Sequence, residues 1–114
     1  MMDCVFCKIA AGEIPSTSTY QDELIFAFRD IHPMAPCHVL IIPRKHFASL
    51  NDIGSADSAL LGHMVSTAQK LAREEGVAES GYRLVINCGP QGGQVVPHLH
   101  LHLLGGYQLS GELG

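Results

Sequence analysis

The chain has 114 residues, of which 46% are hydrophobic and 16% are charged. A chain of this length and composition forms one globular domain with its own core, so we expect a single domain over residues 1–114. The net charge of -4 argues against nucleic acid as a partner. The apolar runs, such as residues 39–42, are far short of the roughly 20 residues that a membrane-spanning helix needs, so we expect no membrane contact.

The first residues of the chain predict a short helix. Within residues 3–12, Val5, Phe6 and Ile9 recur at helical spacing, and Gly12 is a typical stop. Three strands should follow. Residues 16–20 and 24–28 flank a polar turn and predict a hairpin, while the apolar residues 38–42 predict the third strand.

The second half of the chain predicts one long helix and two more strands. Ser55 or Asp57 should start the helix and Gly76 should end it. Its apolar positions recur every three or four residues: Leu60, Leu61, Met64, Val65, Ala68, Leu71 and Ala72. Residues 82–87 predict a strand and residues 89–94 a glycine-rich loop. Because strands and helices come in blocks without βαβ alternation, we expect an α+β fold with an antiparallel sheet.

Histidine and leucine alternate over residues 98–104, which predicts a strand with three imidazoles on one face. Same-face side chains lie about 6.6 Å apart along a strand, so the histidines could converge on one ligand. A metal cage, a proton relay and nucleophilic catalysis all fit this arrangement. The sequence offers no acid between the histidines and Glu112, which weakens a catalytic metal. The glycine-rich loop favours a phosphate ligand, because successive backbone N–H groups suit an anion.

Cys4 and Cys7 form a lone CxxC motif, which fits a redox pair, half of a metal site, or two small apolar residues on a helix. No strand precedes the motif, so a thioredoxin-like redox role is disfavoured. Cys37 and Cys88 fit buried small residues. Because nothing places the four cysteines in an oxidising compartment, we expect a reducing, cytoplasmic setting.

Residues 98–104, with the sequence HLHLHLL, resemble the His-φ-His-φ-His-φ-φ signature of the histidine-triad (HIT) superfamily. Further segments are similar to its nucleotide-binding Hint branch in order and spacing: residues 28–31, 35–38, 42–46, Asn87, 92–94 and 105–106. The resemblance implies a HIT-like fold with about five antiparallel strands, one long helix and a short N-terminal helix. It also implies a homodimer with a continuous sheet, and a purine nucleoside phosphoramidase that cleaves the P–N bond of AMP-like substrates or acyl- and aminoacyl-AMP.

The resemblance assigns His100 as the nucleophile that attacks the α-phosphorus and forms a nucleotidyl-histidine intermediate. A neutral imidazole is available for this attack near pH 7, and covalent catalysis splits one difficult step into two. His102 and His38 would donate hydrogen bonds to phosphate oxygens and help protonate the leaving amine. No catalytic cofactor is implied.

The same resemblance assigns the residues that hold the purine nucleotide. Asp30 would accept hydrogen bonds from the ribose hydroxyls, and Asn87, Gly93 and Gln94 would form the phosphate cradle. An apolar slot for the base would be lined by Phe6, Ile9, Phe28, Ile31 and Leu40. For Phe28 and Leu40, ordinary core packing fits equally well, because a pocket wall and a core use the same residue types.

Relatives with the CxxC motif bind a structural zinc through two further histidines, which the resemblance places at His46 and His98. Together with Cys4 and Cys7 they would form a closed Cys₂His₂ set. Such a zinc would tether the N-terminal helix to the sheet.

Two other functions stay open. Dinucleoside polyphosphate hydrolases use the same histidine chemistry, but they commonly carry glutamine at the third triad position, where this chain has His102. A protein that binds a purine nucleotide without turnover would share most of the site. Val95 departs from the Hint pattern, which has a hydroxyl residue after the Gly-Gly-Gln segment, so the preference for a leaving group is an open question.

Overall fold

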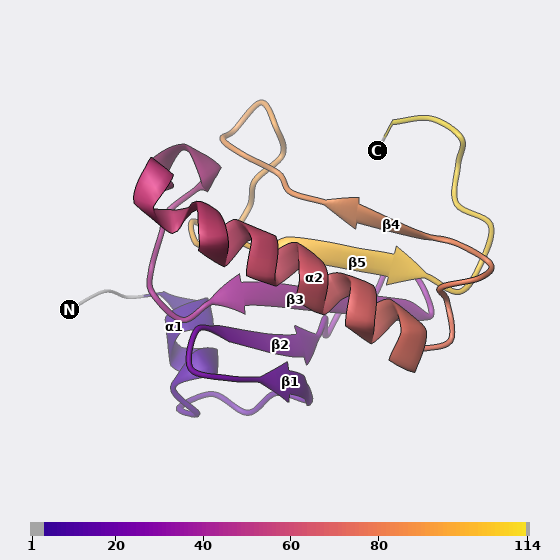
Figure 1. The fold of residues 1–114 in the computed structure, drawn as a ribbon, viewed down its shortest axis with the longest axis horizontal. Helices are drawn as coiled ribbons and strands as arrows, with labels where there is room; N and C mark the ends of the chain where they lie inside the picture. The colour runs from indigo at the N-terminus through magenta and orange to yellow at the C-terminus, as the bar shows by residue number, and fades with distance from the viewer. Residues whose placement is uncertain (1–3, 114) are drawn as a thin grey trace.

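A computed structural model describes residues 4–113, and in that range the chain forms a five-stranded sheet with two α-helices (Figure 1). The elements in chain order are α1 (Val5–Ala10), β1 (Ser18–Gln21), β2 (Ile25–Arg29), β3 (Cys37–Pro43), α2 (Ser58–Glu74), β4 (Tyr82–Val85) and β5 (Leu101–Gly105). The strand order is β1-β2-β3-β5-β4, and all neighbouring strands are antiparallel. The predicted α+β class is therefore confirmed.

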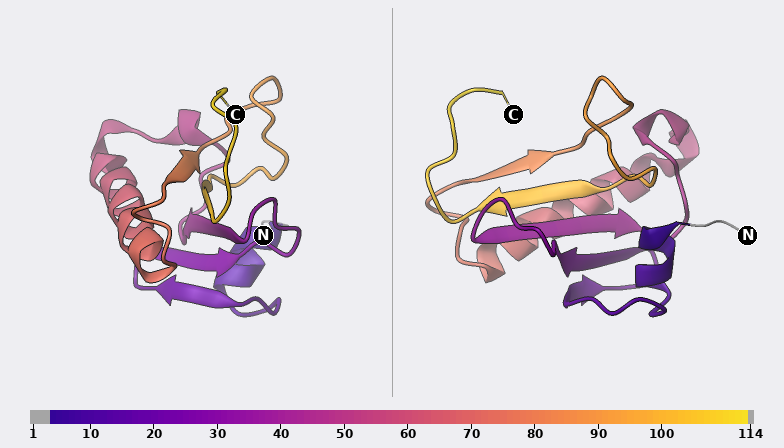
Figure 2. Two further views of the ribbon diagram at one scale, coloured as in Figure 1. Left: turned by 90° about the vertical axis from the view of Figure 1, so that its right-hand side faces the viewer. Right: turned by 180° about the vertical axis from the view of Figure 1, so that it is seen from behind.

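The two helices lie on opposite faces of the sheet, as the side view shows (Figure 2). Alternation along β3 makes this possible, since Val39 and Ile41 belong to the core beneath α2, whereas Leu40 and Ile42 pack on the α1 side. The central strand is thus buried on both faces, which explains its uninterrupted apolar sequence.

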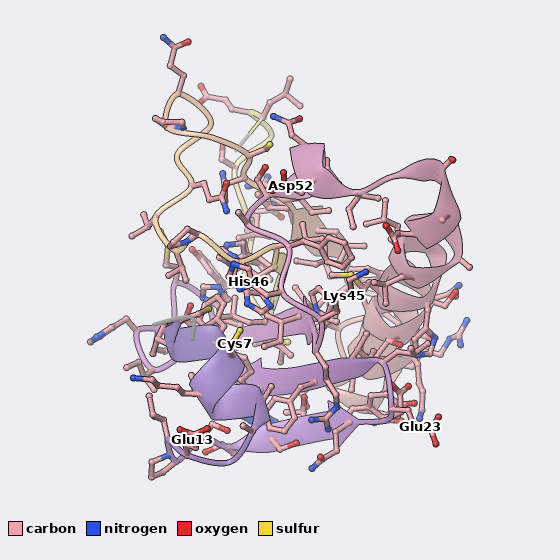
Figure 3. The ribbon with its side chains drawn as sticks, turned by 90° about the vertical axis from the view of Figure 1, so that its left-hand side faces the viewer. Cys7, Glu13, Glu23, Lys45, His46 and Asp52 are labelled. Carbon is pink, nitrogen blue, oxygen red and sulfur yellow. The ribbon has the colours of Figure 1, made fainter. Side chains whose placement is uncertain are left out.

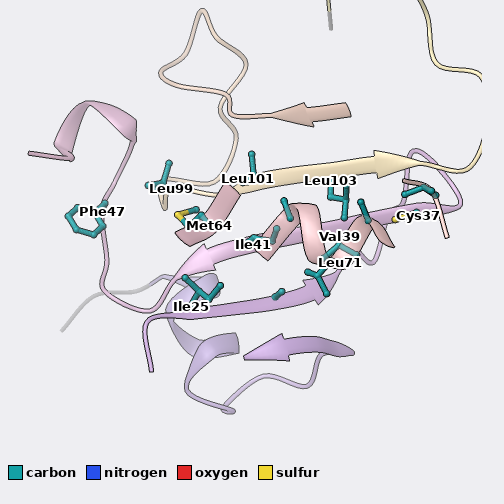
Figure 4. Close-up of a cluster of buried hydrophobic side chains, with 14 residues drawn as sticks. Ile25, Cys37, Val39, Ile41, Phe47, Met64, Leu71, Leu99, Leu101 and Leu103 are labelled. Atoms are coloured by element: carbon teal, nitrogen blue, oxygen red, sulfur yellow. The ribbon is translucent and has the colours of Figure 1, made fainter. Parts of the chain in front are cut away.

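The larger core lies between α2 and the sheet (Figure 4). The helix buries Met64, Ala68, Leu71 and Ala72, which form one stripe at helical spacing. Full burial of a leucine side chain contributes about 1.5–3 kcal/mol, so burial of this face is a substantial source of stability. The helix ends as predicted at Gly76, whose φ of 75° belongs to the left-handed region.

The smaller core lies beneath α1 and consists of Cys4, Phe6, Phe26, Phe28, Leu40 and Ile42. Cys4 is the N-cap of α1, while Asp3 lies outside the described residues. Arg44 ties α1 to the hairpin, because it donates to the carbonyls of Ala10 at 2.9 Å and Asp22 at 2.7 Å. This face, rather than the α2 face, carries the histidines of β3 and β5.

The prediction of a strand from residue 98 onward is wrong in one respect, because β5 starts only at Leu101. The reason lies in the partner strand. Ile41 pairs with Leu101, so a longer ladder would bring Leu99 opposite Pro43, which has no N–H to donate. Residues 98–100 therefore lie outside the sheet ladder.

Among residues 4–113, no helix is both long enough and apolar enough to span a membrane.

Candidate active site and metal cluster

His38 and His102 meet on the face opposite α2. The β3–β5 register pairs Leu40 with His102, which makes His38 a diagonal neighbour of His102. His38 Nε2 lies 2.9 Å from His102 Nδ1. The backbone N–H of Met34 donates to His38 Nδ1 at 3.0 Å, so the proton of neutral His38 must be on Nε2. His38 then donates to His102, and neutral His102 carries its proton on Nε2.

His100 has the opposite arrangement of protons. Its Nδ1 lies 2.7 Å from the carbonyl oxygen of His98, which can only accept, so Nδ1 carries the proton and Nε2 has a free lone pair. The ring of Phe6 packs edge-on against the His100 ring at 5.1 Å, and the His102 ring lies 4.9 Å away on the other side. Among the three catalytic candidates, only His100 presents a nucleophilic nitrogen.

Burial keeps the histidine pair neutral. Burial, with the neighbouring His100 and His38, lowers the pKa of His102 to about 4. Burial also lowers the pKa of His38, although Asp30 opposes the effect from 3.5 Å. Both rings are therefore uncharged near pH 7 and donate N–H groups rather than carrying positive charge.

Asp30 follows β2 and lies beside His38. One carboxylate oxygen accepts from the backbone N–H of His32 at 2.8 Å, which shapes the loop, and the other faces His38 Nε2. Of the residues proposed to line the base slot, the structure buries Phe6, Phe28 and Leu40 together in the smaller core, with Ile9 packed at its margin. Ile31 is separate from this group, since it is 83% exposed in the loop after β2.

The glycine-rich loop is closed by its own hydrogen bonds. The N–H groups of Gly92 and Gly93 donate to loop carbonyls, and Asn87 Nδ2 donates to the Gly92 carbonyl at 2.8 Å. Gln94 accepts from the Gly89 N–H at 2.9 Å. A Cβ atom at Gly92 would collide with the Cys88 carbonyl oxygen, so glycine is required there. The expectation of a cradle formed by successive glycine amides therefore does not fit, because these amides already have acceptors.

Two backbone donors could not be found from residue types in the sequence. Among residues 4–113, the N–H of Val95 has no acceptor, and it directly follows the closed loop. The N–H of Met34 fixes the proton of His38. Main-chain groups are present at every position, so residue type does not reveal which of them point toward a site.

Cys4, Cys7, His46 and His98 converge at the N-terminus of α1, and Cys7 and His46 lie side by side in the view from that end (Figure 3). His98 Nδ1 lies 3.2 Å from Cys4 Sγ, 3.6 Å from Cys7 Sγ and 3.1 Å from His46 Nδ1. Ligands of a tetrahedral zinc are separated by about 3.3–3.8 Å, given bonds of about 2.0–2.3 Å. The predicted metal residues are thus brought together at distances that suit one ion.

Hydrogen bonds of the second ring nitrogen distinguish this cluster from the Asp30, His38 and His102 group, whose donor atoms are also close together. His98 Nε2 donates to the Pro43 carbonyl at 2.9 Å, so its Nδ1 lone pair points into the cysteine cluster, as a metal ligand requires. His38 instead has a proton on the nitrogen that faces its neighbours. The cysteine cluster is therefore suited to a metal, and the His38 and His102 pair to hydrogen-bond donation.

The pKa of the Cys7 thiol also depends on its surroundings. Burial, together with the adjacent Cys4 thiol, raises the pKa of Cys7 to about 11. A thiol of this kind stays protonated near neutral pH unless a cation displaces the proton.

His38 and His102 on one face of an antiparallel sheet, with His100 and its free lone pair beside them, form an arrangement suited to nucleophilic catalysis. Comparison with known proteins agrees. The family model described as HIT domain matches residues 11–109. The chain is 50% identical over 108 residues to the purine nucleoside phosphoramidase of Escherichia coli K12, a match that covers 95% of this chain and 91% of that protein.

Two solved structures extend the likeness. A HIT family hydrolase from Legionella pneumophila superposes with a TM-score of 0.96 at 55% identity, covering 98% of this chain and 100% of that one. A zinc-bound histidine triad protein from Mycobacterium smegmatis superposes with a TM-score of 0.79 at 33% identity, covering 91% of this chain and 75% of that one. The chain belongs to the HIT family, and it is an enzyme of the hydrolase type found in that family.

Proposed function

We propose that this hydrolase cleaves the P–N bond of AMP-like phosphoramidates, or the corresponding bond of acyl- and aminoacyl-AMP, through a nucleotidyl-His100 intermediate. One observation carries the proposal: the His100 Nδ1 proton is held by the His98 carbonyl at 2.7 Å, which leaves Nε2 free to attack. The 50% identity to a purine nucleoside phosphoramidase supports the substrate class.

In the first step, His100 Nε2 attacks the α-phosphorus, a new N–P bond forms, and the bond to the leaving amine breaks. His102 Nε2–H donates to a phosphate oxygen, and His38 holds the His102 ring through the 2.9 Å contact. The anionic phosphate favours the protonated form of His102, which then supplies the proton that the leaving amine takes. In the second step, water attacks the same phosphorus and gives its proton to His102, which restores the proton lost to the amine. The N–P bond to His100 breaks, AMP leaves, and His100 is regenerated.

The nucleotide would lie along the face that carries the smaller core. Asp30 is proposed to accept hydrogen bonds from the ribose hydroxyls, because its carboxylate lies at the edge of the histidine pair. Phe6, Phe28 and Leu40 are proposed as the apolar wall for the base, with Ile9 and Ile31 at its rim. Asn87, Gly93 and Gln94 would shape the phosphate side by holding the loop closed, which presents the Val95 N–H to the phosphate.

We also propose that Cys4, Cys7, His46 and His98 hold a structural zinc, which would staple α1 to the sheet and take no part in the chemistry. The zinc-bound relative from Mycobacterium smegmatis supports this choice of ion. A homodimer with a continuous sheet is proposed on family grounds. Cytoplasmic residence is proposed because all four cysteines are free thiols in the structure, which suits a reducing compartment.

The test is AMP release from adenosine 5′-phosphoramidate and from an AMP-lysine conjugate. We expect His100→Ala to lower kcat on the order of 10³-fold or more, because the nucleophile is removed. A short treatment with a metal chelator that leaves bound zinc in place should not change the rate. His32→Ala is the matched control, since this histidine is exposed and outside the site.

The outcomes separate the alternatives. Turnover retained in folded His100→Ala would contradict the mechanism. AMP binding without turnover by the wild type would identify a nucleotide-binding protein, and faster cleavage of a diadenosine polyphosphate than of the phosphoramidates would identify a P–O hydrolase.

A further inference from the structure

The segment that carries the proposed nucleophile lies outside the ladder of β3 and β5. β5 begins at Leu101, and residues 96–100 are attached instead to the stretch that follows β3. The Leu99 N–H donates to the Phe47 carbonyl at 2.7 Å, and Gln94 Nε2 donates to the Ala48 carbonyl at 2.7 Å. The orientation of His100 therefore depends on contacts outside the ladder of β3 and β5.

His98 is the central contact of this segment, and it is fully buried. Its Nε2 donates to the Pro43 carbonyl at 2.9 Å, and its Nδ1 faces Cys4 Sγ at 3.2 Å. Its own carbonyl oxygen accepts the Nδ1 proton of His100 at 2.7 Å. One residue is therefore both a member of the metal cluster and the acceptor that aims the nucleophile.

Leu99, between the two histidines, is buried in the larger core on the opposite face. Its side chain anchors the middle of the segment but does not fix the rotation of the flanking residues. That rotation depends on the contacts of His98, and three of its partners in the cluster come from distant parts of the chain: Cys4, Cys7 and His46.

We propose that metal in the cluster of Cys4, Cys7, His46 and His98 positions His100, so that metal occupancy controls turnover as well as the attachment of α1. His98 is the positioning residue, and it acts through its carbonyl. The proposal rests on the function proposed above for His100. Without the ion, the four donor atoms are joined only by weak thiol and imidazole contacts. The ring of His98 is then held on one side alone, by the Pro43 carbonyl, and its own carbonyl aims His100 less firmly.

A metal that only attaches α1 to the sheet would behave differently. The larger core contains no residue of α1, so loss of the metal should leave α2 and the sheet in place. If the metal has only this structural role, its loss should lower the melting temperature and leave the hydrogen exchange rate of the Leu99 amide unchanged. A positioning role predicts that the link between residues 96–100 and Phe47 loosens and that kcat falls while KM for substrate changes little.

The experiment uses the full chain loaded with Zn²⁺, the same protein after exhaustive chelation under reducing conditions, and chelated protein reloaded with Zn²⁺. Bound metal, melting temperature, hydrogen exchange of the Leu99 amide, and kcat and KM are measured on each. His46→Ala removes one donor, His46→Cys restores a fourth donor, and His32→Ala is the control that leaves the cluster intact.

Metal loss should speed exchange of the Leu99 amide about tenfold or more and lower kcat about 10²-fold, with both effects reversed by Zn²⁺. His46→Ala should resemble the chelated protein, and His46→Cys should recover both properties. The two His46 variants also test the proposal if exhaustive chelation unfolds the chain, because His46 lies outside α1 and both cores.

The proposal is overturned if the wild type binds no metal, or if metal-free and metal-loaded proteins share the same Leu99 exchange and kcat. If zinc-loaded wild type shows no turnover on any substrate, the proposed function fails. The hydrogen exchange rate of the Leu99 amide, compared between metal-free and metal-loaded protein, then tests the positioning role independently of activity.

Discussion

Backbone amide and carbonyl groups fix where the protons of the site histidines lie. The Met34 amide leaves His38 as a donor, and the His98 carbonyl leaves His100 with a free Nε2. Three imidazoles of identical chemistry thereby receive different tasks. The His-Leu alternation placed His100 and His102 near each other, and the family resemblance added His38. The folded main chain is what distinguishes the proposed nucleophile from its helpers.

The half-buried His102 makes stability depend on pH. Its pKa is lowered by burial from 6.5 to about 4, so between these values the unfolded chain binds a proton that the folded chain does not. Stability contributed by this residue is fully present above pH 6.5 and decreases as the pH falls toward 4. We expect the melting temperature of zinc-loaded wild type to fall more steeply over this range than that of His102→Asn. Parallel curves would contradict the assignment.

Val95 is the position at which a hydroxyl donor is expected to change the rate of turnover. Its side chain is 89% exposed just after the glycine-rich loop of residues 89–94, and its N–H has no acceptor among residues 4–113. Val95→Ser keeps the amide and adds a hydroxyl donor near the leaving group. We expect a higher kcat with the AMP-lysine conjugate and an unchanged melting temperature. An equal or lower rate in the folded variant would show that a donor at this position does not assist departure of the amine.

The hairpin of β1 and β2 depends on one carboxylate that sequence patterns did not single out. Asp22 accepts from the amides of Leu24 and Ile25 and from Tyr20, and it lies 2.6 Å from His63 Nε2 on α2. Burial alone would raise its pKa, but the hydrogen bonds from His63 and these amides hold the pKa well below its usual range. His63 thus links α2 to the turn.

We expect Asp22→Ala to lower the free energy of unfolding by about 1–3 kcal/mol, because several donors lose their acceptor together. Urea titration measures the loss. Glu23→Ala in the same turn is the control, since Glu23 is exposed, and it should change stability by less than about 0.5 kcal/mol. Equal effects of the two variants would mean that the turn does not need the Asp22 network.

The elements themselves were largely predictable from periodicity. The apolar run of β3 and the stripe of α2 appear where the sequence places them, since burial requires those spacings. The start of β5 was not predictable from the His-Leu alternation, because it depends on Pro43 in the partner strand. Likewise, loop composition indicated an anion site at residues 89–94, while the actual hydrogen bonds show these amides already used.

At the scale of the whole molecule, β1 and β4 are the outer strands of the sheet. A continuous sheet in a homodimer requires one of them to pair with its counterpart, and the exposed backbone of an outer strand is the feature that allows this. The expected result of sedimentation equilibrium is a mass of about twice the 12.3 kDa of one chain. A monomer at the enzyme concentrations used in assays would contradict the proposed assembly.

The metal cluster joins residues that are 94 positions apart, Cys4 near one end of the described chain and His98 close to the other. During synthesis on the ribosome, Cys4 and Cys7 are made long before their partner His98. A nascent chain that stops before residue 98 therefore lacks both a complete metal site and the nucleophile. Closure of this long loop comes late in folding, so capture of the ion would mark a chain that has been translated through residue 98.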